Sequence, residues 1–358
     1  MSELTIIGGG VIGLAAAWRA AVEGHRVTLY DPDPGRGASW VAGGMLAPVT
    51  EAWPGEEDVL RLGEASLRRW PEFARELAAE GVDPGLAGHG TLVVALDSAD
   101  AGQLDILAGF LRSLGRDAEP LTGRAARRAE PGIGSVRSGL LVPGDLAVDN
   151  RKLLRALEHA CRGRGVVFHS DRIDTLDDVH ADAVVLAAGA WTGRLHPLLA
   201  GAVRPLKGEI LRLRPRRGCL PPPVNTVRAL VEGRPIYLVP RADGELVLGA
   251  TQYEAGFDES VTARGVRELL EGAERVFPAI AEYELVETAA GLRAGSLDAL
   301  PFVGELGDGV FAATGHHRNG LLMAPVTADA VVAWLAGEAP PDGVGAASPA
   351  RLRERERV

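Results

Sequence analysis

The stretch that decides the fold runs from Leu4 to Asp31 and reads LTIIGGGVIGLAAAWRAAVEGHRVTLYD. It begins as an apolar strand and continues into a turn with Gly8, Gly10 and Gly13. Small residues then favour a helix, which ends at a glycine at position 24. A tight turn between a strand and a helix presents backbone amides to a pyrophosphate, whose negative charge the helix dipole favours. We therefore predict a dinucleotide site at these three glycines.

A second strand over residues 26–30 leads to Asp31, which lies 18 residues after Gly13. This is close to the spacing at which a carboxylate accepts hydrogen bonds from the adenosine ribose. An acid here also disfavours a 2′-phosphate, which would require an arginine. The alternative is a glycine-rich turn that only packs a helix on a sheet.

Composition limits the classes of function. The chain has 358 residues, which suits two domains, and its 46% hydrophobic and 24% charged residues are typical of a globular protein. A net charge of −10 argues against a nucleic-acid partner. Any anionic substrate must therefore be bound by local arginines.

The two cysteines, Cys161 and Cys219, are isolated and lack metal-ligand spacing. We expect free thiols in a reducing compartment and no metal. The N-terminal residues lack the features of a secretory signal, and residues 4–18 are too short and too rich in glycine to span a membrane. The expected location is the cytoplasm, without a membrane partner.

The rest of the chain alternates helical and strand patterns. Residues 32–48 are too apolar for a solvated loop, so we expect them to lie against a flat buried surface, with Ser39 able to donate to a phosphate; the alternative is a buried connector without a ligand. We expect helices over residues 57–80 (in two parts, broken at Pro71), 99–114, 122–129, 150–162 and 260–276, and strands over residues 90–96 and 166–169.

Two later regions set the fold class. Residues 183–191 form a continuously apolar strand, as in a parallel sheet, which returns the chain to the nucleotide fold. Short strands at 208–213, 236–239 and 245–248 indicate a second, mostly antiparallel sheet. We predict an α/β plus α+β protein: a Rossmann-type nucleotide-binding domain (1–87, 140–200 and 290–337) interleaved with a substrate domain (88–139 and 201–289). Residues 338–358 are expected to form a flexible tail.

Several of these pieces together resemble the FAD-dependent D-amino-acid oxidase superfamily and, within it, the glycine oxidases of thiamine biosynthesis. The GGML, PLKGE and YLVPR segments are narrower signals than the glycine turn. The matching segments span nearly the whole chain in order and are residues 6–13, 42–51, 204–209, 236–241, 248–251, 291–293, 300–304 and 315–325.

The resemblance implies oxidative deamination of glycine, and of sarcosine or small D-amino acids, by hydride transfer to FAD. The expected products are an imino acid and glyoxylate, ammonia and, with molecular oxygen, hydrogen peroxide. FAD should be non-covalent because residues 291–322 contain no cysteine. The superfamily also suggests a homotetramer. The alternatives are a sarcosine or D-amino-acid oxidase, an FAD dehydrogenase with another electron acceptor, and a flavin-binding module without activity.

Four side chains match positions of the substrate site in this family. Arg293 would bind the substrate carboxylate through two parallel hydrogen bonds. Tyr237 would hydrogen-bond the same carboxylate and shape the pocket without acting as a base, and both are therefore candidate catalytic residues. Arg318 matches a second substrate-site arginine, and Glu51 is a weaker match facing the amine. The alternatives are a surface salt bridge for Arg293, a core position for Tyr237 and a structural ion pair for Arg318.

The family match also implies cofactor contacts. A helix beginning near residues 319–320 would direct its positive end at the edge of the flavin where reduction deposits charge. The adjacent histidines 316 and 317 suggest a metal, but no set of further ligands accompanies them. The complete set of expected contacts is Gly8, Gly10, Val11, Ile12, Gly13, Asp31, Pro32, Ser39, Gly43, Gly44, Met45, Ile173, Ala188, Gly189, Trp191, Gly315, His316, His317, Arg318, Asn319, Gly320, Leu321 and Leu322.

The sequence departs from the family pattern at Gln252, Pro235 and His317, of which the last stands where an aromatic residue is common. All three lie in segments expected to form the pocket. Because one methylene of fit is worth only about 1–3 kcal/mol, these departures leave glycine, sarcosine and small D-amino acids unranked.

Overall fold

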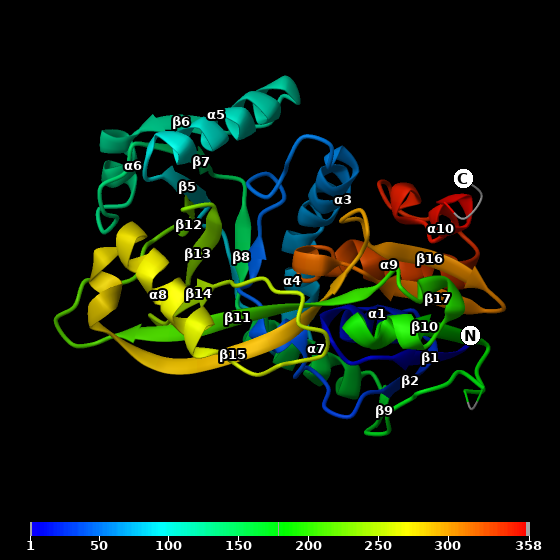
Figure 1. Ribbon diagram of the computed structural model, residues 1–358. Coiled ribbons are helices and arrows are strands. Elements are labelled where there is room, and N and C mark those ends of the chain that lie inside the picture. The colour runs from blue at the N-terminus through cyan, green and yellow to red at the C-terminus, as the bar shows by residue number, and fades with distance from the viewer. Residues whose placement is uncertain (1, 178, 356–358) are drawn as a thin grey trace.

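The computed structural model describes residues 2–177 and 179–355 and contains three sheets (Figure 1). The first has six strands in the order β16-β17-β10-β1-β2-β9, and all neighbours are parallel except β16 and β17. Its strands are β1 (Glu3–Ile7), β2 (Arg26–Tyr30), β9 (Val167–His169), β10 (Ala183–Leu186), β16 (Phe302–Gly307) and β17 (Val310–Thr314). The predicted return of the chain to a parallel sheet is confirmed by the pairing of β10 with β1, but the strand expected over residues 183–191 ends at Leu186 and a 3₁₀ helix begins at Gly189.

Small residues let helix α1 (Val11–Val22) pack closely on this sheet. Nine of its 12 residues are buried, and it contacts both α7 (Asn150–Gly163) and α9 (Ala324–Ala336). Gly24 follows α1 with φ of +84°, a conformation that ends a helix readily. The result is a strand, a glycine turn and a helix in the predicted order.

The second sheet has eight strands in the order β15-β11-β14-β13-β12-β5-β7-β6. Only β12 and β5 are parallel, so the prediction of a mostly antiparallel sheet is confirmed. The long strands β11 and β15 run along one edge (Figure 1). The members are β5 (Thr91–Ala95), β6 (Glu119–Thr122), β7 (Ser138–Val142), β11 (Arg204–Pro215), β12 (Thr226–Val231), β13 (Arg234–Pro240), β14 (Leu246–Gly249) and β15 (Tyr283–Gly295).

A small third sheet and several helices complete the fold. The sheet pairs β8 (Leu146–Val148) with β3 (Met45–Leu46) and β4 (Leu86–Ala87). The other α-helices are α2 (Ala38–Val41), α3 (Glu57–Leu67), α4 (Trp70–Ala79), α5 (Ser98–Ser113), α6 (Gly123–Ala129), α8 (Ala263–Val276) and α10 (Ala350–Arg355). Short 3₁₀ helices cover Gly189–Arg194, Pro197–Leu199, Pro278–Glu282, His317–Asn319 and Gly345–Ala347.

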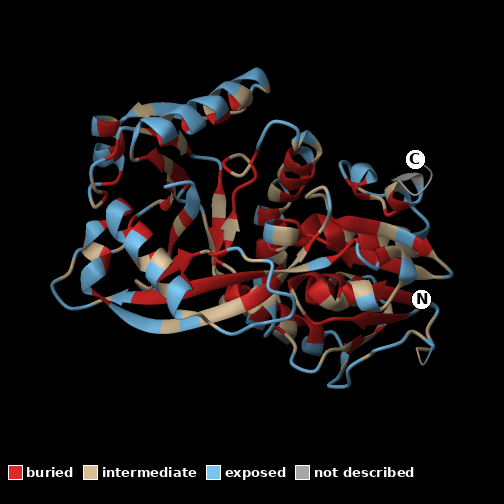
Figure 2. Ribbon diagram, viewed as in Figure 1, coloured by how far each residue is buried: buried red, intermediate tan, exposed pale blue. Residues whose placement is uncertain are grey.

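Two large apolar cores lie against the two main sheets, and Figure 2 shows buried residues concentrated there. One joins α1, α7 and α9 to the six-stranded sheet, whereas the other lies between α8 and the eight-stranded sheet. In the described residues, no helix is both long and apolar enough to cross a membrane.

The structure corrects three expectations. The predicted boundaries at 139/140 and 289/290 cut through β7 and β15, because both strands pair as units within the eight-stranded sheet. Of the expected flexible tail, residues 338–355 instead fold back, with Val344 and Ala347 buried in the first core, and residues 356–358 lie outside the described residues. The division of binding roles between the two parts stays a prediction.

The third correction concerns the last helix. We expected it to begin near residues 319–320, but residues 317–319 form a 3₁₀ turn and α9 begins at Ala324. Pro325 lies in the first turn of α9, where its missing amide does no harm. The same proline could not donate a hydrogen bond to residue 321, so an α-helix cannot run unbroken from position 319.

Candidate cofactor and substrate site

The glycine turn has room for a ligand because side chains are excluded from it. Gly8 has φ of +109°, and a Cβ there would lie 2.3 Å from the carbonyl oxygen of Ala187. A Cβ on Gly13 would lie 1.8 Å from the carbonyl oxygen of Gly8. These two glycines therefore let α1 pack against the strand end, which fixes the turn at the start of the helix.

Two polar side chains contact the same turn. The amide of Val11, at the start of α1, donates to Ser39 Oγ at 3.0 Å. Asp31 accepts from the amides of Gly9 at 2.6 Å and Asp33 at 2.8 Å. A carboxylate offers about four lone-pair positions, so Asp31 keeps capacity to accept hydrogen bonds from a ribose. It both stabilises the turn and faces the cavity.

A cavity of about 470 Å³ begins at this turn. It runs between the ends of the parallel strands and the loop of residues 171–174, as expected for a ligand at the carboxyl ends of strands. The predicted cofactor residues that line it are Gly8, Gly10, Val11, Ile12, Asp31, Pro32, Ser39, Ile173, Ala188, Gly189, Trp191, His316, His317 and Gly320.

A second cavity, of about 370 Å³, lies toward the eight-stranded sheet. Six residues line both cavities, namely Val11, Ala38, Ser39, Arg293, His317 and Gly320, so the two spaces adjoin. The predicted residues found in the second cavity alone are Gly43, Gly44, Met45, Glu51, Pro235, Tyr237, Gln252, Arg318 and Leu321. The structure thus brings together segments from nearly the whole chain.

Arg293 on β15 is the half-buried cation at the junction of the two cavities. Its Nη1 donates to the carbonyl oxygen of Thr251 at 3.2 Å. Within the described residues it forms no ion pair with a carboxylate. A half-buried guanidinium without a counter-ion is a strong site for an anion, and its fork suits a carboxylate.

Tyr237 on β13 lies between two glycines. A Cβ on Gly43 would lie 2.5 Å from its ring, and one on Gly249 would lie 2.3 Å away. Burial raises the pKa of Tyr237 above 10, although the nearby Arg293 opposes this shift. The phenol therefore stays protonated at neutral pH and is available as a hydrogen-bond donor in the second cavity.

Arg318 differs from Arg293 because it is already paired. It contacts Glu51 Oε2 at 3.4 Å and Glu56 Oε2 at 3.2 Å. Glu51 in turn binds Arg228 at 3.3 Å, and the side chain of Glu51 is only 9% exposed. Glu51 thus bridges two guanidinium groups, which leaves it poorly suited to bind a substrate amine directly.

The two histidines have different surroundings. Burial lowers the pKa of His316 to about 3, and its Nε2 lies 3.0 Å from Thr327 Oγ1. The pKa of His317 falls to about 4 through burial and the charges of Arg318 and Arg293. Both rings are neutral at pH 7. In the described part of the chain, no cluster of three or more His, Cys, Asp and Glu side chains could hold a metal.

Four predicted cofactor residues line neither large cavity. Gly13 packs α1 onto the strand, and Gly315 has φ of +77° beside Phe302. Asn319 and Leu322 are buried next to a separate small cavity. Since α9 begins at Ala324, Asn319 and Leu322 belong to the turns that precede this helix and lie behind the cavity wall.

Sequence reasoning missed two charged groups at or near the site. Arg228 on β12 lines the second cavity and donates to the carbonyl oxygen of Thr50 at 2.6 Å. Asp145 is fully buried, accepts from Thr50 Oγ1 at 2.8 Å, and burial raises its pKa to about 7. The only local signal was a charged residue within an otherwise apolar pattern at position 228.

Known proteins are similar to this chain in both sequence and fold. The family of FAD-dependent oxidoreductases matches residues 3–334. The glycine oxidase of Geobacillus kaustophilus is 33% identical, covering 91% of this chain and 90% of its own. The putative thiamine biosynthesis oxidoreductase ThiO of Rhizobium etli is 34% identical, covering 94% and 97%. A crystal structure of glycine oxidase from Geobacillus kaustophilus is 31% identical, covers 97% of this chain and 98% of its own, and has a TM-score of 0.89.

Proposed function

The chain belongs to the family of FAD-dependent oxidoreductases, and from this premise we propose that it binds FAD without a covalent link and oxidises glycine. The observation that carries the proposal is the unpaired Arg293 at the junction of two cavities. One cavity begins at a dinucleotide turn, and the other adjoins it and is lined by Arg293 and Tyr237, whose N–H and O–H groups suit a small carboxylate.

The residues present fit FAD. The turn at Gly8 excludes side chains, and Ser39 Oγ accepts a hydrogen bond from the first amide of α1. Asp31 faces the first cavity, which begins at this turn. The opening shared with the second cavity would let a flavin ring reach the substrate. Bound FAD would supply a hydride acceptor for the amino acid α-carbon and a route for the electrons to molecular oxygen, which gives hydrogen peroxide.

The protein's own part is to bind and orient the substrate. Arg293 would bind the substrate carboxylate through two hydrogen bonds, which fixes the position of the α-carbon. The protonated phenol of Tyr237 would donate to the same carboxylate. Arg318 and Arg228, both paired with Glu51, form another part of the wall of the second cavity. Arg318 therefore acts mainly by shaping this wall, and direct contact with the carboxylate belongs to Arg293.

The test is direct. Purified protein loaded with FAD should release hydrogen peroxide, glyoxylate and ammonia from glycine in air, and glycine should bleach its flavin without oxygen. A panel of glycine, sarcosine and D-alanine ranked by kcat/KM separates this activity from that of a sarcosine or D-amino-acid oxidase. Turnover only with an artificial acceptor would indicate a dehydrogenase. A flavin that none of these amines reduces would overturn the proposal.

We further propose that the product supplies the thiazole part of thiamine. The similarity to the Rhizobium etli protein supports this context. Thiamine auxotrophy after gene deletion, relieved by thiazole, would test it.

We propose a homotetramer from the family resemblance and the cytoplasm as its location. Free Cys161 and Cys219 fit the reducing conditions there. Light scattering and cell fractionation are the measurements that decide these two points.

A further inference from the structure

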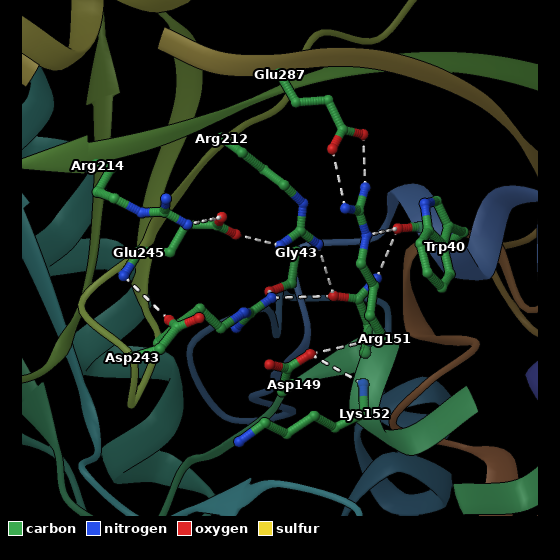
Figure 3. A network of polar contacts seen from close by, with 12 residues as sticks. Trp40, Gly43, Asp149, Arg151, Lys152, Arg212, Arg214, Asp243, Glu245 and Glu287 are labelled. Carbon is green, nitrogen blue, oxygen red and sulfur yellow. Dashed lines mark hydrogen bonds and ion pairs between the residues drawn. The ribbon is translucent and has the colours of Figure 1, made fainter. Parts of the chain in front are cut away.

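A buried polar network behind the site takes no part in substrate binding. Its centre is Asn150, the first residue of α7, which is 0% exposed. Two arginines of the eight-stranded sheet region converge on it, Arg212 at 3% and Arg241 at 8% exposure. Figure 3 shows this network, with Arg212, Glu245 and Gly43 labelled. Charged side chains are rarely buried so deeply unless they are paired, so the network requires an explanation.

The side-chain amide of Asn150 uses all of its hydrogen-bonding capacity. Its Nδ2 donates to the carbonyl oxygens of Ser39 at 2.9 Å and Trp40 at 2.8 Å. Its Oδ1 accepts from Arg212 at 3.2 Å and from Arg241 at 3.1 Å. One buried amide therefore links the segment of residues 38–45 to both arginines, and each bond fixes the orientation of the others.

Arg241 also contacts the other end of that segment. Its Nη2 donates to the carbonyl oxygen of Gly43 at 2.8 Å. A Cβ on Gly44 would lie 3.2 Å from the same nitrogen, so the guanidinium lies directly against the two glycines. At the first end, Ser39 contacts the amide of Val11 at the dinucleotide turn. The network thus holds both ends of the segment.

This segment borders both cavities. Ala38 and Ser39 line both cavities, whereas Gly43 and Gly44 line only the second one, which we call the substrate cavity. Arg241 contacts Gly43 and therefore lies directly behind a residue of the cavity wall, a few residues along the chain from Ala38 and Ser39 at the junction of the two cavities.

The charges of the two arginines are not balanced equally. Arg212 forms an ion pair with Glu245. Arg241 forms no ion pair within the described residues, and its Nε has no hydrogen-bond partner there. Burial lowers the pKa of Arg241 to about 10, and the charge of Arg212 adds to this shift while the charges of Asp149 and Glu245 oppose it, so the side chain stays charged at neutral pH. Asp149 and Glu245 thus offset the buried charge from a distance, but no carboxylate is in direct contact with Arg241 in the described residues, and a buried cation of this kind is stabilised by a further anion nearby.

We propose that Arg241, held by Asn150, is a positioning residue that supplies a fixed positive charge to the redox cofactor through the Gly43–Gly44 segment and thereby favours its reduced form. Reduction adds negative charge to the ring, and a nearby fixed cation stabilises that charge more than the neutral oxidised ring. The inference rests on the proposed binding of FAD but not on glycine as the substrate.

The experiment measures the midpoint potential of bound FAD with reference dyes and a chemical reductant, without any amino acid. For Arg241→Gln we expect the preference for reduced over oxidised cofactor to fall about tenfold, which is about 30 mV more negative for a two-electron couple. Arg241→Lys keeps the charge and should stay close to the original potential. FAD that binds to Arg241→Gln with an unchanged potential would overturn the inference and leave the proposed function intact.

Glu245→Gln provides a test with the opposite sign. It removes the counter-charge of Arg212, so the potential should become more positive, whereas general loosening of the segment gives no reason for opposite shifts. If Arg241→Gln does not fold, Glu245→Gln decides the matter alone. A positive shift supports the inference, and no shift or a negative one refutes it. Failure of the unaltered protein to bind FAD would instead refute the proposed function.

Discussion

Gly208→Ala should impair catalysis by moving Arg293 without removing it. Gly208 lies on β11 at the floor of the substrate cavity, and the guanidinium of Arg293 lies across it. A Cβ at this position would lie 2.3 Å from Arg293 Nη1 and 2.4 Å from its Cζ. Ordinary contacts begin at 3.4 Å, so the guanidinium must move by about 1 Å. It is the end of a flexible side chain, and it can move without unfolding the strand.

The size of the effect follows from that displacement. A misplacement of about 1 Å in a positioning group costs about 10²-fold in rate. We therefore expect kcat/KM for glycine to fall by about two orders of magnitude. The backbone of Gly208 does not require a positive φ, so folding should change little, since alanine at a compatible position even adds about 0.4–1 kcal/mol.

The assay is steady-state peroxide release, accompanied by FAD content and a thermal melt. Gly102→Ala is the matched control, because a Cβ there on α5 meets nothing within 4 Å. It should keep full activity and bind FAD equally well. If Gly208→Ala also kept kcat/KM within twofold of the original while folded and loaded with FAD, Arg293 would not be the residue that positions the substrate.

Three further outcomes follow from the structure. Arg293→Met should lower kcat/KM by about 10²–10⁴-fold, since two hydrogen bonds to a carboxylate are worth about 1.5–3 kcal/mol each. Arg318→Met should lower kcat/KM by less than about tenfold, because Arg318 is already paired with Glu51 and Glu56. Equal losses in the two variants would contradict this ranking. The pKa of His316 is lowered from 6.5 in the unfolded chain to about 3 in the fold. Protonation of His316 therefore costs no unfolding free energy above pH 6.5, and below that pH it lowers the free energy of unfolding by about 1.4 kcal/mol per pH unit. Thermal melts of His316→Gln should show a shallower dependence on acid pH. The pKa of Asp145 is raised from 3.8 to about 7, so its protonated form is favoured in the fold and stability is lost as the pH rises from about 3.8 to about 7. Asp145→Asn should therefore have a higher melting temperature than the original protein, and the difference should grow up to about pH 7.

Local patterns were sufficient where the signal was continuous in sequence. The glycine turn, its helix and the second strand were all predicted from residues 4–31, because turn geometry, helix termination and strand alternation depend on near neighbours. The break between α3 and α4 was predicted from Pro71, which lies in the first turn of α4. The identity of the pocket arginines came from the family resemblance and not from any spacing.

Strand β15 shows why the rest was missed. Its residues alternate poorly, and Glu284, Leu285 and Val286 are all exposed because β15 is an edge strand. Its register is set by pairing with β11, about 80 residues earlier. The network around Asn150 is equally invisible, since Arg241 contacts positions 91 and 198 residues away. Polar contacts over such distances depend on the assembled fold and have no local pattern.

The arrangement of charges explains how an acidic chain can bind an anionic group. Three arginines line the substrate cavity, Arg228, Arg293 and Arg318. Glu51 pairs with two of them and Glu56 adds a second contact to Arg318, which neutralises that wall. Of these three, Arg293 alone has no carboxylate partner among the described residues, so we expect a substrate carboxylate to bind there. We therefore expect the selectivity to come from pairing all but one of the arginines that line the cavity, and the net charge of −10 does not oppose binding because nearby charges dominate the electrostatic field at short range.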